Sequence, residues 1–169
     1  MEILVRGIVE AFRIVFSGDA EVASIALLSI RVSCSAVALA VVLGVPVGAV
    51  LAWGRFRGRR AILASVNALM GLPPVVAGLL VVMLLWRGGV LEGLGWLYTP
   101  SGMVLAQTII ALPIVAGLSA SAYQQQSDRL RLQLLALGAS RLQAWWLLTY
   151  EARLALLAAV MAALGRVLA

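Results

Sequence analysis

Few side chains in this sequence could perform acid–base, nucleophilic or metal chemistry. The 169 residues contain no histidine and a single cysteine, Cys34, so the commonest general base and transition-metal ligand is missing. None of the seven acidic residues lies in the middle of an apolar run, and no GxxxxGK[ST] phosphate-binding loop occurs. We therefore expect no catalytic residue, no metal site and no cofactor. This chain alone is not expected to hydrolyse ATP.

Arginine is the abundant charged residue. All thirteen basic residues are arginines, and the formal net charge is +6. Most of them sit in short segments between apolar runs, which favours an orienting role in a membrane over a nucleic-acid surface. Arg31 differs because it lies inside the first long apolar run. Its guanidinium could guide an anion, or it could simply reach the membrane surface, and the sequence leaves both open.

The composition is that of an integral membrane protein. Hydrophobic residues make up 63% of the chain, charged residues only 12%, and the mean hydropathy is +1.06. A soluble domain carries about a quarter of its residues charged. Apolar runs near the length of a membrane-spanning helix cover residues 21–53, 61–86, 102–123 and 154–169. The sequence predicts an all-α polytopic membrane protein, with an amphipathic interfacial segment at 1–20 and a transmembrane domain at 21–169.

Prolines and glycines interrupt the apolar runs. Pro73 and Pro74 in "GLPPVVAG" remove two backbone donors and disfavour the α conformation at Leu72, so we expect a break there. Pro113 in "ALPIVAG" is a further candidate break. Such breaks could line a translocation path, or they could be tolerated kinks. "GVPVG" combines a GxxxG spacing with a proline and predicts a close helix contact, a kink, or both.

A polar segment at residues 124–153 separates the last two runs. It reads as two helical stretches hinged at Gly138. The apolar side of the first would hold Leu130, Leu134 and Leu137, and that of the second Leu142, Trp145, Trp146 and Thr149. The small residues Gly138, Ala139 and Ser140 at the hinge could enter the groove of another protein. We expect a helix-turn-helix lying across one membrane surface.

The arginine distribution predicts the orientation. The loops at 54–60 and 124–153 share eight arginines, whereas the N-terminal segment and the Gly-rich loop after residue 86 share three. Because arginine-rich loops stay in the cytoplasm, both loops should be cytoplasmic and the N-terminus extracytoplasmic. The sequence thus predicts a multi-pass protein of the plasma membrane.

The polar segment resembles the coupling loop of ABC importer permeases, whose pattern is Glu-Ala-Ala, three residues, Gly, nine residues, Ile, one residue, Leu-Pro. With Gly138 on the glycine, Leu132-Gln133-Leu134 fall on Glu-Ala-Ala, Leu148 falls on Ile, and Tyr150-Glu151 replace Leu-Pro. The glycine and the spacing match, but the acidic start and the Leu-Pro do not. "GLPPVVAGLLVVMLL", "LYTPSGMVLAQTIIALPIVAGL" and the closing "GRVLA" are similar to permeases for tetrahedral oxyanions, most of all the tungstate type.

This resemblance implies a type I importer permease core (MetI-like) and a coupling loop centred on residues Leu137, Gly138, Ala139, Ser140 and Arg141. The implied partners are a second permease copy, a cytoplasmic ATPase dimer and an extracytoplasmic oxyanion-binding protein. Tungstate is the implied substrate, with molybdate, sulfate or another solute as alternatives. A non-transporting membrane scaffold is the alternative of another class. Since the last run has only sixteen residues and the family continues past "GRVLA", we expect the chain to be incomplete at its C-terminus.

Overall fold

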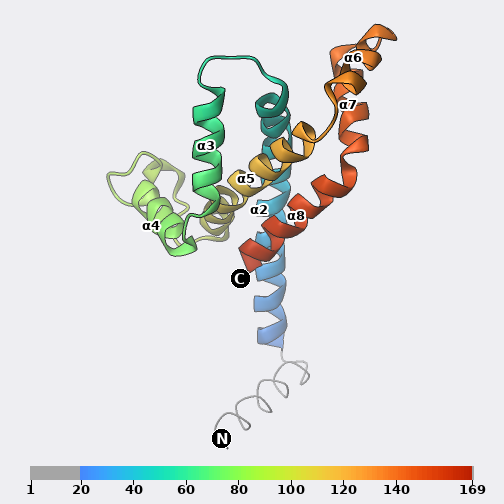
Figure 1. Ribbon diagram of the computed structural model, residues 1–169. Coiled ribbons are helices and arrows are strands. Elements are labelled where there is room, and N and C mark those ends of the chain that lie inside the picture. Colours follow the sequence, from blue (N-terminus) through green and yellow to red (C-terminus); the bar gives the residue numbers. More distant parts are fainter. Residues whose placement is uncertain (1–19, 169) are drawn as a thin grey trace, which may run out of the picture. The chain divides into compact units, whose positions relative to one another are not determined.

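The computed structural model describes residues 20–168, and these form helices and connecting turns with no strand in that range (Figure 1). The all-α prediction is confirmed, whereas the interfacial segment predicted at 1–20 lies outside the described residues except for Ala20. The elements in chain order are α2 (Ala20–Trp53), α3 (Arg59–Met70), α4 (Pro74–Leu85), the short 3₁₀ helix η1 (Glu92–Leu94), α5 (Pro100–Gln124), α6 (Asp128–Ala136), α7 (Arg141–Glu151) and α8 (Arg153–Leu168).

The chain divides into two compact units, Met1–Val32 and Ser33–Ala169. The described part of the first unit is the beginning of α2, where Arg31 is exposed and the Ser24 hydroxyl donates a 2.7 Å hydrogen bond to the Glu21 carbonyl. All contacts discussed below belong to the second unit.

Two helices, α2 and α5, are each long and apolar enough to cross a membrane. Two further pairs pass the same test only when each pair is taken together: α3 with α4, bent by 105°, and α7 with α8, bent by 70°. The first and third predicted runs therefore appear as continuous helices and the second as a bent pair. The fourth corresponds to α8 alone, since α7 lies in the predicted polar segment. This is the arrangement expected of an integral membrane protein.

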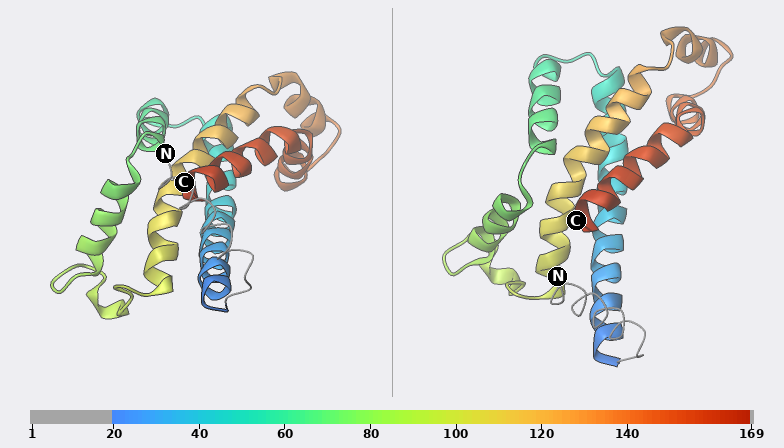
Figure 2. Two further views of the ribbon diagram at one scale, coloured as in Figure 1. Left: turned by 90° about the horizontal axis from the view of Figure 1, so that it is seen from below. Right: turned by 60° about the horizontal axis from the view of Figure 1, so that its bottom comes forward.

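Helix α5 lies at the centre of the second unit. Helices α3, α4 and α8 pack against it, and α8 runs alongside α5 (Figure 2). The main core cluster takes its buried side chains from α2, α5 and α8, namely Val37, Ala40, Ala111, Ile114, Val115 and Ala163. Because several of these residues are alanines, the helix backbones can approach closely, which is how membrane helices gain packing energy.

The GxxxG pair on α2 makes such a close contact. A Cβ atom built on Gly48 would lie 2.7 Å from the Ser119 Cβ and 2.9 Å from the Ala116 carbonyl oxygen, both on α5. A Cβ on Gly44 would lie 3.0 Å from the Val115 Cβ. The predicted close helix contact is confirmed, and its partner is the small-residue face of α5.

The two proline sites behave differently. Helix α3 ends at Met70, Pro73 is the N-cap of α4 and Pro74 occupies its first turn, so the predicted break in the second run is confirmed. Pro113, in contrast, lies buried inside a continuous α5, and the prediction of a candidate break there was wrong. An isolated proline removes a single backbone donor, and α5 continues as one helix through it.

Candidate functional site

The turn between α6 and α7, residues 137–140, is here called the elbow. Leu137 is the C-cap of α6, and Gly138 follows with φ +85°, a left-handed conformation that strongly favours glycine. The Gly138 N–H donates to the Leu135 carbonyl over 3.1 Å, and the Ala139 N–H donates to the Leu134 carbonyl over 3.0 Å. These two bonds form a complete Schellman motif, which satisfies the last carbonyls of α6.

The other side of the elbow is capped as tightly. Ser140 is the N-cap of α7, and its hydroxyl oxygen accepts a hydrogen bond from the Gln143 N–H over 3.3 Å. The Gln143 side-chain oxygen accepts in turn from the Ser140 N–H over 2.8 Å, which completes a capping box. Local hydrogen bonds therefore fix both halves of the hinge, and the predicted helix-turn-helix at Gly138 is confirmed.

The outer face of the elbow and α7 exposes large apolar side chains. Leu137 is 84% exposed, Leu142 73% and Trp146 67%. The surface beside them is hollowed over about 570 Å³, and this hollow is lined by Ala139, Leu142, Gln143, Trp145, Trp146 and Leu147. Contiguous exposed apolar surface of this kind marks a contact site for a protein or for lipid.

The inner face of α7 differs from the sequence expectation. Ala144 and Leu148 are buried, at 3% and 2% exposure, whereas Leu142 and Trp146 point away from the bundle. The packed face thus follows the i, i+4 spacing of Ala144 and Leu148 and continues to Ala152. The expected apolar side of α7 was therefore right only in part. Trp145 packs against the core and Thr149 contacts Tyr123, whereas Leu142 and Trp146 are exposed.

Polar contacts tie α7 to the end of α5. The hydroxyl groups of Tyr123 and Thr149 lie 2.9 Å apart, and the Gln126 side-chain amide donates to the Leu148 carbonyl over 2.7 Å. The Tyr123 ring also packs on Trp53 at the end of α2, with ring centroids 4.7 Å apart. A displacement of α7 must therefore displace the end of α5 or break these bonds.

The break between α3 and α4 receives a partner from α8. Arg166 donates a hydrogen bond from its guanidinium to the Leu72 carbonyl over 3.1 Å. Pro73 and Pro74 cannot donate backbone hydrogen bonds, so the chain around Leu72 leaves polar groups that need partners in a membrane. The hydrogen bond thus connects α8 to the break between α3 and α4.

These features match a known membrane-protein family. The family model described as "Binding-protein-dependent transport system inner membrane component" matches residues 44–168, which include the broken helix, α5 and the elbow. The chain belongs to this family. The predicted resemblance to oxyanion ABC permeases is confirmed by the relatives of this chain.

Three relatives illustrate the range. A probable anion ABC transporter permease protein of Haloferax volcanii is 38% identical over 85% of this chain and 62% of its own length. The tungstate uptake system permease protein TupB of Peptoclostridium acidaminophilum is 33% identical over 85% of this chain and 63% of its length. A molybdenum transport system permease protein ModB of Mycobacterium tuberculosis is 32% identical over 73% and 49%. The chain therefore spans less than two thirds of the length of each of these relatives.

The predicted coupling residues lie together in the structure. Leu137, Gly138, Ala139, Ser140 and Arg141 form the elbow and the first residue of α7, and all except the half-buried Ala139 are exposed. Pro73 and Pro74 lie at the break, distant in sequence and structure from the elbow. Arg31 belongs to the first unit, where its side chain is exposed. The roles assigned to these residues stay predictions.

Sequence reasoning missed the contacts that hold the elbow and the break in place. The Tyr123–Thr149 pair and the Gln126–Leu148 bond join residues more than twenty positions apart, and no local pattern identifies them. Arg166 carried a signal, because an arginine inside an apolar run must find a polar partner or reach water. Among the described residues, no group of three or more His, Cys, Asp or Glu side chains could hold a metal ion.

Proposed function

We propose that this chain is the membrane-spanning subunit of an ATP-driven importer for a tetrahedral oxyanion, with tungstate as the first substrate to test. The observation that carries the proposal is the exposed elbow, capped on both sides, in a chain of the binding-protein-dependent permease family. The names of the relatives, which cover anion, tungstate and molybdenum transport, support the substrate class. Molybdate and sulfate are the alternative substrates.

Coupling to ATP hydrolysis runs through the elbow. A separate ATPase subunit docks on the exposed apolar face formed by Leu137, Leu142 and Trp146. When two such subunits close on ATP, they pull on α6 and α7, and the Tyr123–Thr149 and Gln126–Leu148 bonds pass the displacement to α5. Helix α5 then rocks against α2, α3 and α8, which opens the path on one side and closes it on the other.

The broken helix forms part of the path. Discontinuous helices are where transporters place ion contacts, because the half-helix ends expose backbone groups. Pro73 and Pro74 keep α3 and α4 apart, and Arg166 holds the break against α8. A second permease copy completes the path, and an extracytoplasmic binding protein delivers the anion.

The orientation follows the arginine-rich loops. The loop at 54–58 and the α6–α7 hairpin lie at the same end of the second unit (Figure 1). With these arginines on the cytoplasmic side, the elbow faces the ATPase and the N-terminus lies outside the cell.

Reconstitution tests this function directly. The permease would be placed in vesicles with the ATPase and binding protein of the same organism, and ATP turnover measured with tungstate, molybdate and sulfate. We expect anion-dependent stimulation of the ATPase, strongest with tungstate. A complex that binds the ATPase but shows equal turnover with and without every oxyanion would contradict the proposal.

A further inference from the structure

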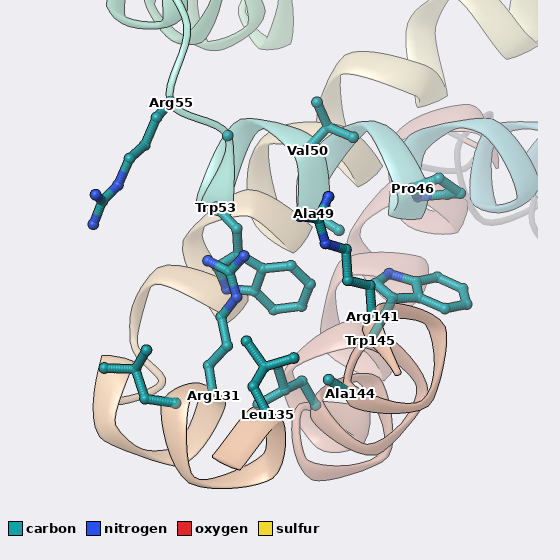
Figure 3. Close-up of a pocket in the computed structure, with 13 residues that line it drawn as sticks. Pro46, Ala49, Val50, Trp53, Arg55, Arg131, Leu135, Arg141, Ala144 and Trp145 are labelled. Carbon is teal, nitrogen blue, oxygen red and sulfur yellow. The ribbon is translucent and has the colours of Figure 1, made fainter. Parts of the chain in front are cut away.

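A groove with a strongly basic lining lies between the end of α2 and the α6–α7 hairpin (Figure 3). Its volume is about 750 Å³. The apolar part of the lining includes Pro46, Val50 and Leu135, and the aromatic part is Trp53 and Trp145. Three arginines complete it, namely Arg55, Arg131 and Arg141. We call this hollow the arginine groove.

The arginines reach the groove from three different segments. The Arg131 guanidinium, from α6, lies over the Trp53 ring at 5.7 Å from its centroid. Arg141, from the start of α7, extends toward α2 beside Ala49, while Arg55 stands at the rim (Figure 3). Among the side chains that the structure describes, no carboxylate lines the groove. Charges of one sign gathered without a counter-charge indicate a site for an anion.

A neighbouring arginine shows the contrast. Arg59 is already satisfied, because its guanidinium donates to the carbonyl oxygens of Leu51 and Ala52 over 2.5 and 2.8 Å, where it caps the end of α2. Neither Arg55 nor Arg141 makes a hydrogen bond or an ion pair with any residue that the structure describes. Their donors are therefore available to a ligand.

An apolar hollow continues from the arginine groove along the membrane-spanning helices. It measures about 540 Å³ and runs between α2 and α8, and it shares Pro46 and Trp145 with the groove. The side chains along it include the exposed Val42 and Leu157, at 68% and 57% exposure. One end of the combined surface therefore carries three arginines, and the other is mostly apolar, with Arg153 as its one charged lining residue.

We propose that this surface binds an anionic phospholipid. The lipid phosphate lies between Arg131 and Arg141, with Arg55 adding charge at the rim, and an acyl chain follows the hollow between α2 and α8. The groove lies at the depth expected of a lipid headgroup, because it opens where α2, a membrane-spanning helix, ends at Trp53. A free inorganic oxyanion would use the arginines but leave the apolar hollow empty, which favours the lipid. Bound there, the lipid joins α2 to the hairpin that carries the elbow.

Lipid binding to the purified permease tests this proposal and needs no ATPase or binding protein, so its result is independent of the transport function. Retention of phosphatidylglycerol and of phosphatidylcholine would be compared by native mass spectrometry. We expect phosphatidylglycerol to be retained preferentially. Each of Arg131→Gln and Arg141→Gln should weaken that retention about fivefold, the effect of one interfacial charge. The Arg57→Gln variant is the matched control, since Arg57 is exposed in the 54–58 loop and lies outside the groove.

Competition experiments distinguish a bound lipid phosphate from a bound free anion. Inorganic phosphate, tungstate and glycerol phosphate lack acyl chains, so none of them should displace phosphatidylglycerol at matched concentration. Displacement by tungstate or phosphate would overturn the lipid assignment in favour of a free-anion site. Equal losses in the Arg131→Gln and Arg57→Gln variants would overturn the site itself. The Arg131→Lys/Arg141→Lys variant should keep most of the retention, which separates lost charge from misfolding.

Discussion

The guanidinium of Arg166 donates a hydrogen bond to the carbonyl of Leu72, 3.1 Å away and 94 residues earlier in the chain. The contact joins the end of α8 to the break between α3 and α4. It explains how a helix can be interrupted in the middle of an apolar run, because a polar group freed in a membrane must find a partner within the protein.

Replacing Arg166 by methionine should destabilise the fold. Arg166→Met keeps much of the apolar stem but leaves the Leu72 carbonyl without its donor, a loss of about 1–3 kcal/mol in the free energy of unfolding. Thermal unfolding in detergent measures it. Arg57→Met removes an exposed arginine and should leave the transition unchanged; equal transitions for the two variants would mean that the Leu72 contact stabilises nothing.

The contact of α2 with α5 predicts a sharp difference between two glycines. Gly48→Ala places a methyl group 2.7 Å from the Ser119 Cβ and 2.9 Å from a backbone oxygen, so the helices must separate, at a loss of about 1–3 kcal/mol. Gly78→Ala, on α4, meets nothing within 4 Å and should cause no loss. Unfolding midpoints of the two variants under identical detergent conditions provide the comparison, and a Gly48→Ala protein as stable as the parent would contradict this packing.

The link between α5 and α7 should be measurable as a coupling energy. Tyr123→Phe and Thr149→Val each remove one hydroxyl of the 2.9 Å pair. A double-mutant cycle should give an interaction of about 0.5–1.5 kcal/mol in the free energy of unfolding. In the reconstituted transporter, Tyr123→Phe should also lower anion-dependent ATPase stimulation. If the two substitutions had additive effects on the free energy of unfolding and the Tyr123→Phe protein kept full ATPase stimulation, this pair would be excluded from the coupling path.

Gly138 offers a test of the elbow. No heavy atom lies within 4 Å of a Cβ placed there, so a substitution acts through the backbone or through a docked partner. Gly138→Glu strains the left-handed conformation and adds a charge to the apolar docking face. It should abolish anion-dependent ATPase stimulation while the protein still inserts in the membrane. Gly138→Asn, which tolerates this conformation better, should retain a substantial part of it. Full stimulation of the Gly138→Glu protein would remove the elbow from the coupling role.

The side of the membrane that the elbow faces can be determined by labelling. In a Cys34→Ser background, a cysteine introduced by Ser140→Cys is the only thiol of the chain. An impermeant maleimide should leave it unlabelled in intact cells and label it in inverted vesicles, because the arginine-rich loops favour the cytoplasm. Labelling in intact cells would reverse the predicted orientation.

Helix positions followed from local sequence. The apolar runs, the double proline at residues 73 and 74, and the glycine at 138 between two polar stretches predicted a long first span over residues 21–53, a broken second span and a hinged hairpin, and the structure has all three. These features depend on neighbours within one or two helical turns. The sequence therefore carries the information for them directly.

The tertiary contacts did not follow from local sequence. The apolar side of α7 was assigned to Leu142, Trp145, Trp146 and Thr149. Ala144 and Leu148 are instead its most buried side chains, and Leu142 and Trp146 are exposed, because the buried face depends on which helices become neighbours. Pro113 was a candidate break, yet α5 continues through it. The partners of Tyr123 and Arg166 depend on which helices become neighbours, and nothing within a few residues of either position encodes that.

The elbow takes every hydrogen bond that shapes it from residues 133–144. A protein that binds there would meet a surface already in its final form, and little chain entropy would be lost in the encounter. Its association rate would then be set by diffusion and orientation, within about 10⁵–10⁷ M⁻¹ s⁻¹, rather than by a slow conformational search.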